Sequence, residues 1–139
     1  MLQFQVSVFP LVVIAVVNFF LSWMWYSPVL FMKPWATALG TYGKKEMTEK
    51  EKKAMPLLFL SGLVASFLLS YGLQVVVHST GATSFLGGLV VGAVAWFTFA
   101  LTHSLSTLWE GRKGVVLVIN NGLYLLTYAV FGGLVAVWK

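Results

Sequence analysis

Residues 114–138 read GVVLVINNGLYLLTYAVFGGLVAVW, and no charged side chain falls between Lys113 and Lys139. An α-helix needs roughly 20 mostly apolar residues to cross about 30 Å of bilayer hydrocarbon. This uncharged run is long enough to do so, and it therefore predicts a membrane-spanning helix.

The rest of the chain has the same pattern. No charged residue precedes Lys33, and only two histidines interrupt the sequence between Lys53 and Glu110. The chain is 59% hydrophobic and 9% charged, and a soluble domain of 139 residues cannot bury that much apolar surface in one core. We therefore expect an all-α fold, an integral membrane four-helix bundle that forms a single domain over residues 1–139. The expected transmembrane segments are residues 4–26, 55–77, 84–108 and 115–138.

A polar, partly helical loop is expected at residues 28–54, between the first two crossings. Thr48 is followed three residues later by Glu51, which is the spacing of a capping box and predicts a helix start. Pro56 follows within the same apolar run, so we expect either a kink there or a separate helix start with Pro56 in its first turn.

Lysine and arginine counts predict the orientation. The loops at 28–54 and 109–114 hold the basic residues, whereas the opposite side has only Lys139 and the amino terminus. We expect a multi-pass protein of the cell membrane with these two loops in the cytoplasm and both termini outside it. Because the net charge of +5 lies in loops beside lipid headgroups, nucleic-acid binding is not expected.

Polar side chains at membrane depth are the candidates for function, because each must be satisfied by protein, water or ligand. Four of these side chains lie in the expected cytoplasmic half: Asn18, His103, Asn120 and Asn121. At about 1.5 Å rise per residue, their distances from the cytoplasmic ends of their helices are similar, so we expect them to form one polar layer. If the first and third crossings are adjacent, Trp25, Tyr26 and Trp109 form the wall of an entrance that leads from the cytoplasm to this layer. The candidate ligand-binding residues are Asn18, Trp25, Tyr26, His103, Thr107, Glu110, Arg112, Asn120 and Asn121.

Each of these residues also has a purely structural interpretation. His103 is either a hydrogen-bonded imidazole that holds helices together or a group that carries a proton or binds a polar ligand. Glu110 and Arg112 form either an interfacial ion pair or part of the mouth, and Asn18 and Asn120 can act as interhelical contacts. No metal-ligand spacing accompanies His103, so no metal site and no cofactor are predicted.

Small residues predict close helix contacts. Gly88 and Gly92 form a GxxxG pair, which allows two helix backbones to approach each other. The pair serves either packing within one chain or a homo-oligomer. Besides such a second copy, the lipid bilayer is the expected partner.

A set of motifs is spread along nearly the whole chain: Trp25-Tyr-Ser-Pro28, Leu30-Phe31, Trp35, Gly92, Trp96, Glu110-Gly-Arg112, Gly122, Gly132 and Trp138. Taken together, these motifs resemble those of a family of small bacterial four-helix membrane proteins classified as a domain of unknown function (family 1761). The resemblance implies a fold without any chemistry.

Three functions are compatible with this sequence. The first is a small transporter or channel-like protein with a polar site in the cytoplasmic half. Four-helix multidrug exporters usually depend on a carboxylate within the membrane. No expected crossing of this chain contains Asp or Glu, so His103 would have to take that role. The alternative is a membrane-embedded lipid- or partner-binding accessory module without catalysis, in which Arg112 and Lys113 face anionic groups. An enzyme has the least support, because the chain has no nucleophile elbow, metal motif or cofactor fingerprint, and we assign no catalytic residue.

Overall fold

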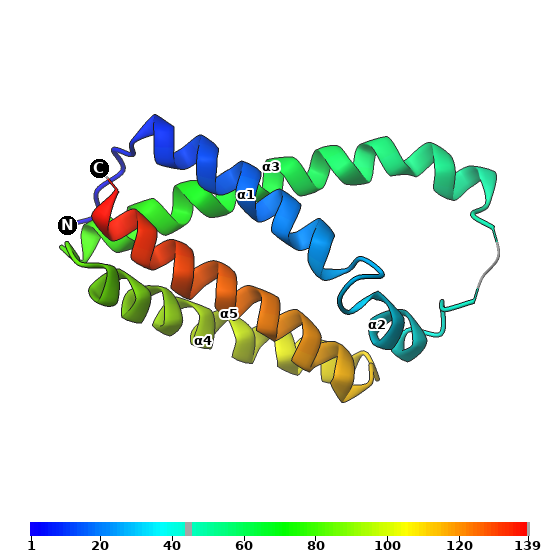
Figure 1. Cartoon of the computed structure of the whole chain (residues 1–139). Coiled ribbons are helices and arrows are strands. Elements are labelled where there is room, and N and C mark those ends of the chain that lie inside the picture. Colours follow the sequence, from blue (N-terminus) through cyan, green and yellow to red (C-terminus); the bar gives the residue numbers. More distant parts are fainter. Residues whose placement is uncertain (44–45, 139) are drawn as a thin grey trace.

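The computed structural model describes residues 1–43 and 46–138, and every regular element in this part of the chain is helical (Figure 1). Each of the four long helices is long and apolar enough to cross a membrane, which is the pattern of a multi-pass membrane protein. The all-α prediction is thus confirmed. The helices are α1 (Val8–Trp25), α2 (Met32–Ala38), α3 (Glu49–Ser79), α4 (Phe85–Trp109) and α5 (Gly114–Val137).

The expected count of four helices is one too low for the described residues. The helical part of the predicted loop is a separate helix, α2, which has 7 residues and contacts α5. It forms because Ser27-Pro28 turns the chain at the end of α1: the Ser27 hydroxyl donates to the carbonyl of Met24, and the Met32 amide donates to the carbonyl of Ser27.

The predicted capping box is confirmed at the start of α3. The Thr48 hydroxyl oxygen accepts a hydrogen bond from the Glu51 amide at 3.2 Å, and the Glu51 carboxylate accepts one from the Thr48 amide at 2.7 Å. Because this cap starts the helix at Glu49, α3 runs through Pro56 without interruption, so the alternative of a separate start at Pro56 is wrong.

Helices α4 and α5 form an antiparallel pair with the most extensive contact in the molecule (Figure 1). Gly88 and Gly92 are buried in it: a methyl group on Gly88 would collide with the carbonyl oxygen of Gly132, and one on Gly92 with that of Tyr128. The close approach that these glycines predict therefore occurs within the chain. The homo-oligomer stays a prediction, and a contact between copies would use a face that α5 does not cover.

The hydrophobic core lies toward the end of the molecule that holds the two termini. Helix α1 crosses α3 there, and both contact α5. Toward the other end, α3 diverges from α1 (Figure 1), so side chains of the two helices no longer fill the space between them. The core residues are Ile14, Leu73, Val77, Phe131, Val135 and Ala136.

Candidate functional site

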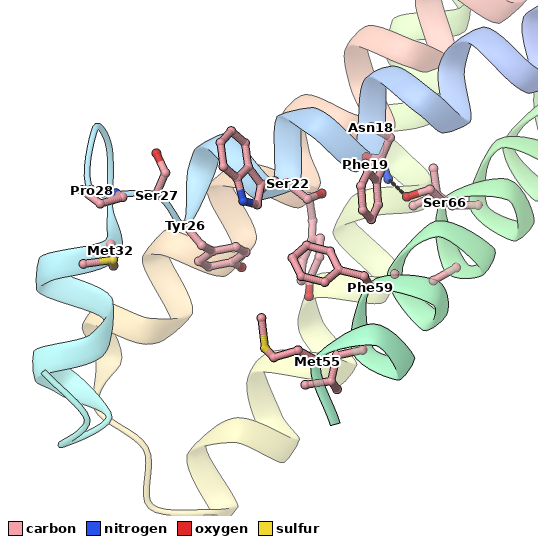
Figure 2. Close-up of a pocket in the computed structure, with 16 residues that line it drawn as sticks. Asn18, Phe19, Ser22, Tyr26, Ser27, Pro28, Met32, Met55, Phe59 and Ser66 are labelled. Carbon is pink, nitrogen blue, oxygen red and sulfur yellow. Dashed lines mark hydrogen bonds between the residues drawn. The ribbon is translucent and has the colours of Figure 1, made fainter. Parts of the chain in front are cut away.

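A pocket of about 650 Å³ lies where α3 diverges from α1 (Figure 2). This volume is in the usual range for sites that bind small molecules. Residues of α1, the turn after it, and α3 form most of the wall, and Tyr124 of α5 completes it. The aromatic rings in the wall are those of Phe19, Trp23, Tyr26, Phe59 and Tyr124.

The inner end of the pocket is built on Asn18, which is 6% exposed. Its amide nitrogen donates to the Ser66 hydroxyl at 2.8 Å, drawn as a dashed line in Figure 2, and its amide oxygen accepts from the Thr127 hydroxyl at 3.1 Å. One side chain therefore links α1, α3 and α5. Because Asn18 and Ser66 also line the pocket, the same contact fixes its inner surface.

The last residues of α1 fix the pocket wall nearest the turn. The Tyr26 hydroxyl donates to the side-chain oxygen of Asn120 at 2.8 Å, and its ring lies 5.0 Å from that of Trp35. The Trp25 indole donates to the carbonyl of Ile119 at 3.0 Å. Both contacts attach the end of α1 to α5, so Tyr26 is held in place independently of α3.

Among the residues that the structure describes, the lining carries no lysine, arginine, aspartate, glutamate or histidine. Its polar groups are amides, hydroxyls and the indole of Trp23, and within the same part of the chain the hydroxyls of Ser22 and Tyr124 have no hydrogen-bond partner. Met32 from α2 and Met55 from α3 add flexible side chains that adapt to ligands of different shape. The pocket thus offers apolar contact area and a small number of free hydroxyl groups.

The residues predicted from the sequence do not all meet at this pocket. Asn18 and Tyr26 line it, and Asn120 touches it only through Tyr26. The assumed adjacency of the first and third crossings is wrong: α1 packs mainly against α3 and α5, while Trp109 of α4 is 84% exposed. Trp25 therefore contacts α5 and shares no wall with Trp109.

A second polar group lies between α4 and α5. The Asn121 amide donates to the Ser104 hydroxyl at 2.8 Å. The His103 ring contacts the edge of Tyr124 with a centroid distance of 5.6 Å, and the Thr107 hydroxyl donates to the carbonyl of His103 at 2.8 Å. Nε2 of His103 and Oδ1 of Asn121 are buried without a partner among the described residues.

Beyond this group, Glu110 and Arg112 form an ion pair of 2.7 Å between half-exposed side chains, as the structural interpretation expects. Water screens such a pair, so it adds little stability. Within the described ranges, no three His, Cys, Asp or Glu side chains gather to offer a metal site.

Sequence reasoning missed most of the pocket wall, including Ser22, Met55 and Phe59. The sequence feature that could have indicated this pocket is the pair of small residues Gly62 and Ser66, which lie four positions apart and leave room on one face of α3. That pair predicts helix packing equally well, so the pattern could not distinguish a filled space from an open one.

Comparison with known proteins gives a single kind of match, to a protein family. No curated protein and no solved structure matches the chain. The family described as "Protein of unknown function (DUF1761)" matches residues 9–136, which is nearly the whole sequence. The chain therefore belongs to this family of unknown function.

Proposed function

We propose that the protein binds a neutral amphiphilic molecule of the membrane in the pocket between α1 and α3. The observation that carries this proposal is the pocket itself, with about 650 Å³ of space, aromatic and methionine walls, and no charged residue in its lining. A molecule that is mostly apolar and carries one or two hydrogen-bonding groups fits such a wall.

The hydroxyls of Ser22 and Tyr124 support an uncharged polar group on the ligand. Both are free to donate a hydrogen bond within the described part of the chain, and a carbonyl, ester or ether oxygen would accept one. A charged ligand group would lose its hydration in this pocket without gaining an opposite charge, which is strongly unfavourable.

The proposal corresponds to a binding module rather than to a transporter. Transport of an ion requires a series of polar groups along the path, each of which can bind the ion and release it to the next. The membrane-depth groups of this chain instead pair mostly with one another, as Asn18 does with Ser66 and Thr127, and Asn121 with Ser104. Binding of a neutral amphiphile needs only the pocket.

Filling the pocket tests the proposal. Gly62 lines it, and a Cβ atom added there has only the Phe19 ring within 4 Å, at 3.5 Å. Gly62→Leu should therefore occupy the pocket without disturbing backbone contacts. Gly72→Leu is the matched control, because Gly72 lies on the same helix and a Cβ atom added there has nothing within 4 Å.

The probe is a monoacylglycerol with a photoactivatable diazirine in its acyl chain, added to purified protein in neutral micelles. Labelling mapped by peptide mass spectrometry should concentrate on α1 and α3 in the wild type and in Gly72→Leu, and should fall severalfold in Gly62→Leu. Equal labelling of all three proteins, or labelling spread over the exposed face of α4, would contradict the proposal.

A further inference from the structure

A second cleft lies on the other face of α2, between that helix and the start of α5. It has a volume of about 350 Å³ and shares no lining residue with the pocket between α1 and α3. The lining residues are Lys33, Pro34, Thr37, Ala38, Lys113 and Val115.

Within residues 1–43 and 46–138, neither lysine of this cleft pairs with a carboxylate. Glu110, the carboxylate nearest in sequence to Lys113, is already paired with Arg112. Lys33 of α2 and Lys113, the residue before α5, line the same cleft, so an anion that enters it can interact with both positive charges.

Uncharged donors add to the two ammonium groups. The Thr37 hydroxyl has no hydrogen-bond partner in the described part of the chain. No side chain caps α5 at Lys113, so the positive end of the helix dipole adds its field on the same side. An anion with several oxygen atoms can accept from all of these donors, and a phosphate group has that chemistry.

The depth of the cleft in the membrane and the apolar residues in its wall indicate that the phosphate belongs to a lipid. The cleft lies at the end of α5, a helix long enough to cross a membrane, and therefore at the level of the lipid headgroups. Pro34, Ala38 and Val115 make part of its wall apolar, which suits the glycerol and upper acyl region of a lipid better than a free ion.

We propose that this cleft binds the phosphate group of an anionic phospholipid. The site is separate from the pocket for a neutral amphiphile and does not depend on it. Binding of dihexanoyl phosphatidic acid to the purified protein in neutral micelles, measured by isothermal titration calorimetry, tests it.

The test variant is Lys33→Gln with Lys113→Gln. Affinity for the lipid should fall about 30-fold, since each lysine beside an anionic headgroup contributes about fivefold. The matched control is Lys50→Gln with Lys53→Gln, which removes the same charge from α3 and should change affinity less than threefold. The charge-preserving variant Lys33→Arg with Lys113→Arg should keep most of the affinity, as should Gly62→Leu.

Three results would overturn the proposal. An equal loss of affinity in the test variant and the control would mean that the basic surface acts only through its overall charge. Inorganic phosphate binding as tightly as phosphatidic acid would mean that the cleft holds a free ion. Loss of affinity in Gly62→Leu would place the lipid in the α1–α3 pocket and would also overturn the assignment.

Discussion

Asn18 links three helices through two buried side-chain hydrogen bonds. It is buried, and its amide bonds to Ser66 on one side and Thr127 on the other. In a membrane, where apolar side chains gain little by leaving lipid, hydrogen bonds of this kind contribute to holding helices together. Asn18 thus has a structural role even though it also lines the pocket.

Asn18→Ala should lower the free energy of unfolding by about 1–2 kcal/mol, because two buried hydroxyls lose their partner. Unfolding by sodium dodecyl sulfate in mixed micelles measures this. Ser61→Ala is the control, since the Ser61 hydroxyl is exposed and bonds within its own helix to the carbonyl of Leu58. Equal stability of the two variants would show that the Asn18 contacts contribute nothing measurable.

The pairing of α4 with α5 depends on glycine. Because Gly88 and Gly92 have no side chain, the α4 backbone approaches the carbonyls of Gly132 and Tyr128 directly. Dispersion and polar contacts between backbones replace the hydrophobic effect in such an interface. The α1–α3 pair has no equivalent contact at its diverging end, which is why that end holds a pocket.

Gly92→Ala should destabilise the protein by about 1–3 kcal/mol, because the added methyl group forces the two helices apart. Thermal unfolding in detergent, followed by circular dichroism, measures the change. Gly72→Ala makes the same substitution in open space on α3 and should be neutral or slightly stabilising. A Gly92→Ala protein as stable as Gly72→Ala would mean that the two helices separate without cost.

The four long helices could be predicted from the sequence, whereas the separate helix α2 and the direction in which the polar residues point could not. Charge spacing places all four crossings, and Thr48 with Glu51 gives the start of α3. Depth along a helix says nothing about rotation around it. Asn120 and Asn121 are adjacent in sequence, but they lie about 100° apart on the helix, so Asn120 contacts α1 and Asn121 contacts α4.

The divergence of α3 could not be predicted for a different reason. Leu57, Leu58 and Leu60 are exposed at its first half, yet they are as apolar as residues of the core. In a membrane protein, lipid-facing and core-facing positions have similar composition, because lipid tails are as apolar as the side chains of the core. The hydrophobic pattern that distinguishes inside from outside in a soluble protein is therefore absent.

In the molecule as a whole, the hydrophobic core lies at one end and the described lysine and arginine residues lie at the other. The amino terminus, the α3–α4 turn and the core lie at one end, and α2, the start of α3 and the α4–α5 turn lie at the other (Figure 1). The described basic residues other than histidine all belong to the second end. Because lysine and arginine are enriched on the cytoplasmic side of membrane proteins, this distribution predicts that the second end is cytoplasmic.

Single cysteines test the orientation directly, because the chain contains none of its own. Thr83→Cys, in the α3–α4 turn, should react with a membrane-impermeant maleimide on intact cells. Thr41→Cys, in the connector before α3, should react only after the membrane is permeabilised. Both positions are exposed, so accessibility within the protein does not limit either reaction. The reverse pattern would mean that the termini face the cytoplasm.

The pocket is open at its side, because Trp23 and Leu58 in its wall are also largely exposed on the outer surfaces of α1 and α3. A ligand dissolved in the bilayer can therefore arrive by lateral diffusion and never enters water. Its occupancy would follow its mole fraction among the surrounding lipids and not its aqueous concentration. A molecule too insoluble to be detected in the cytosol could then saturate the protein.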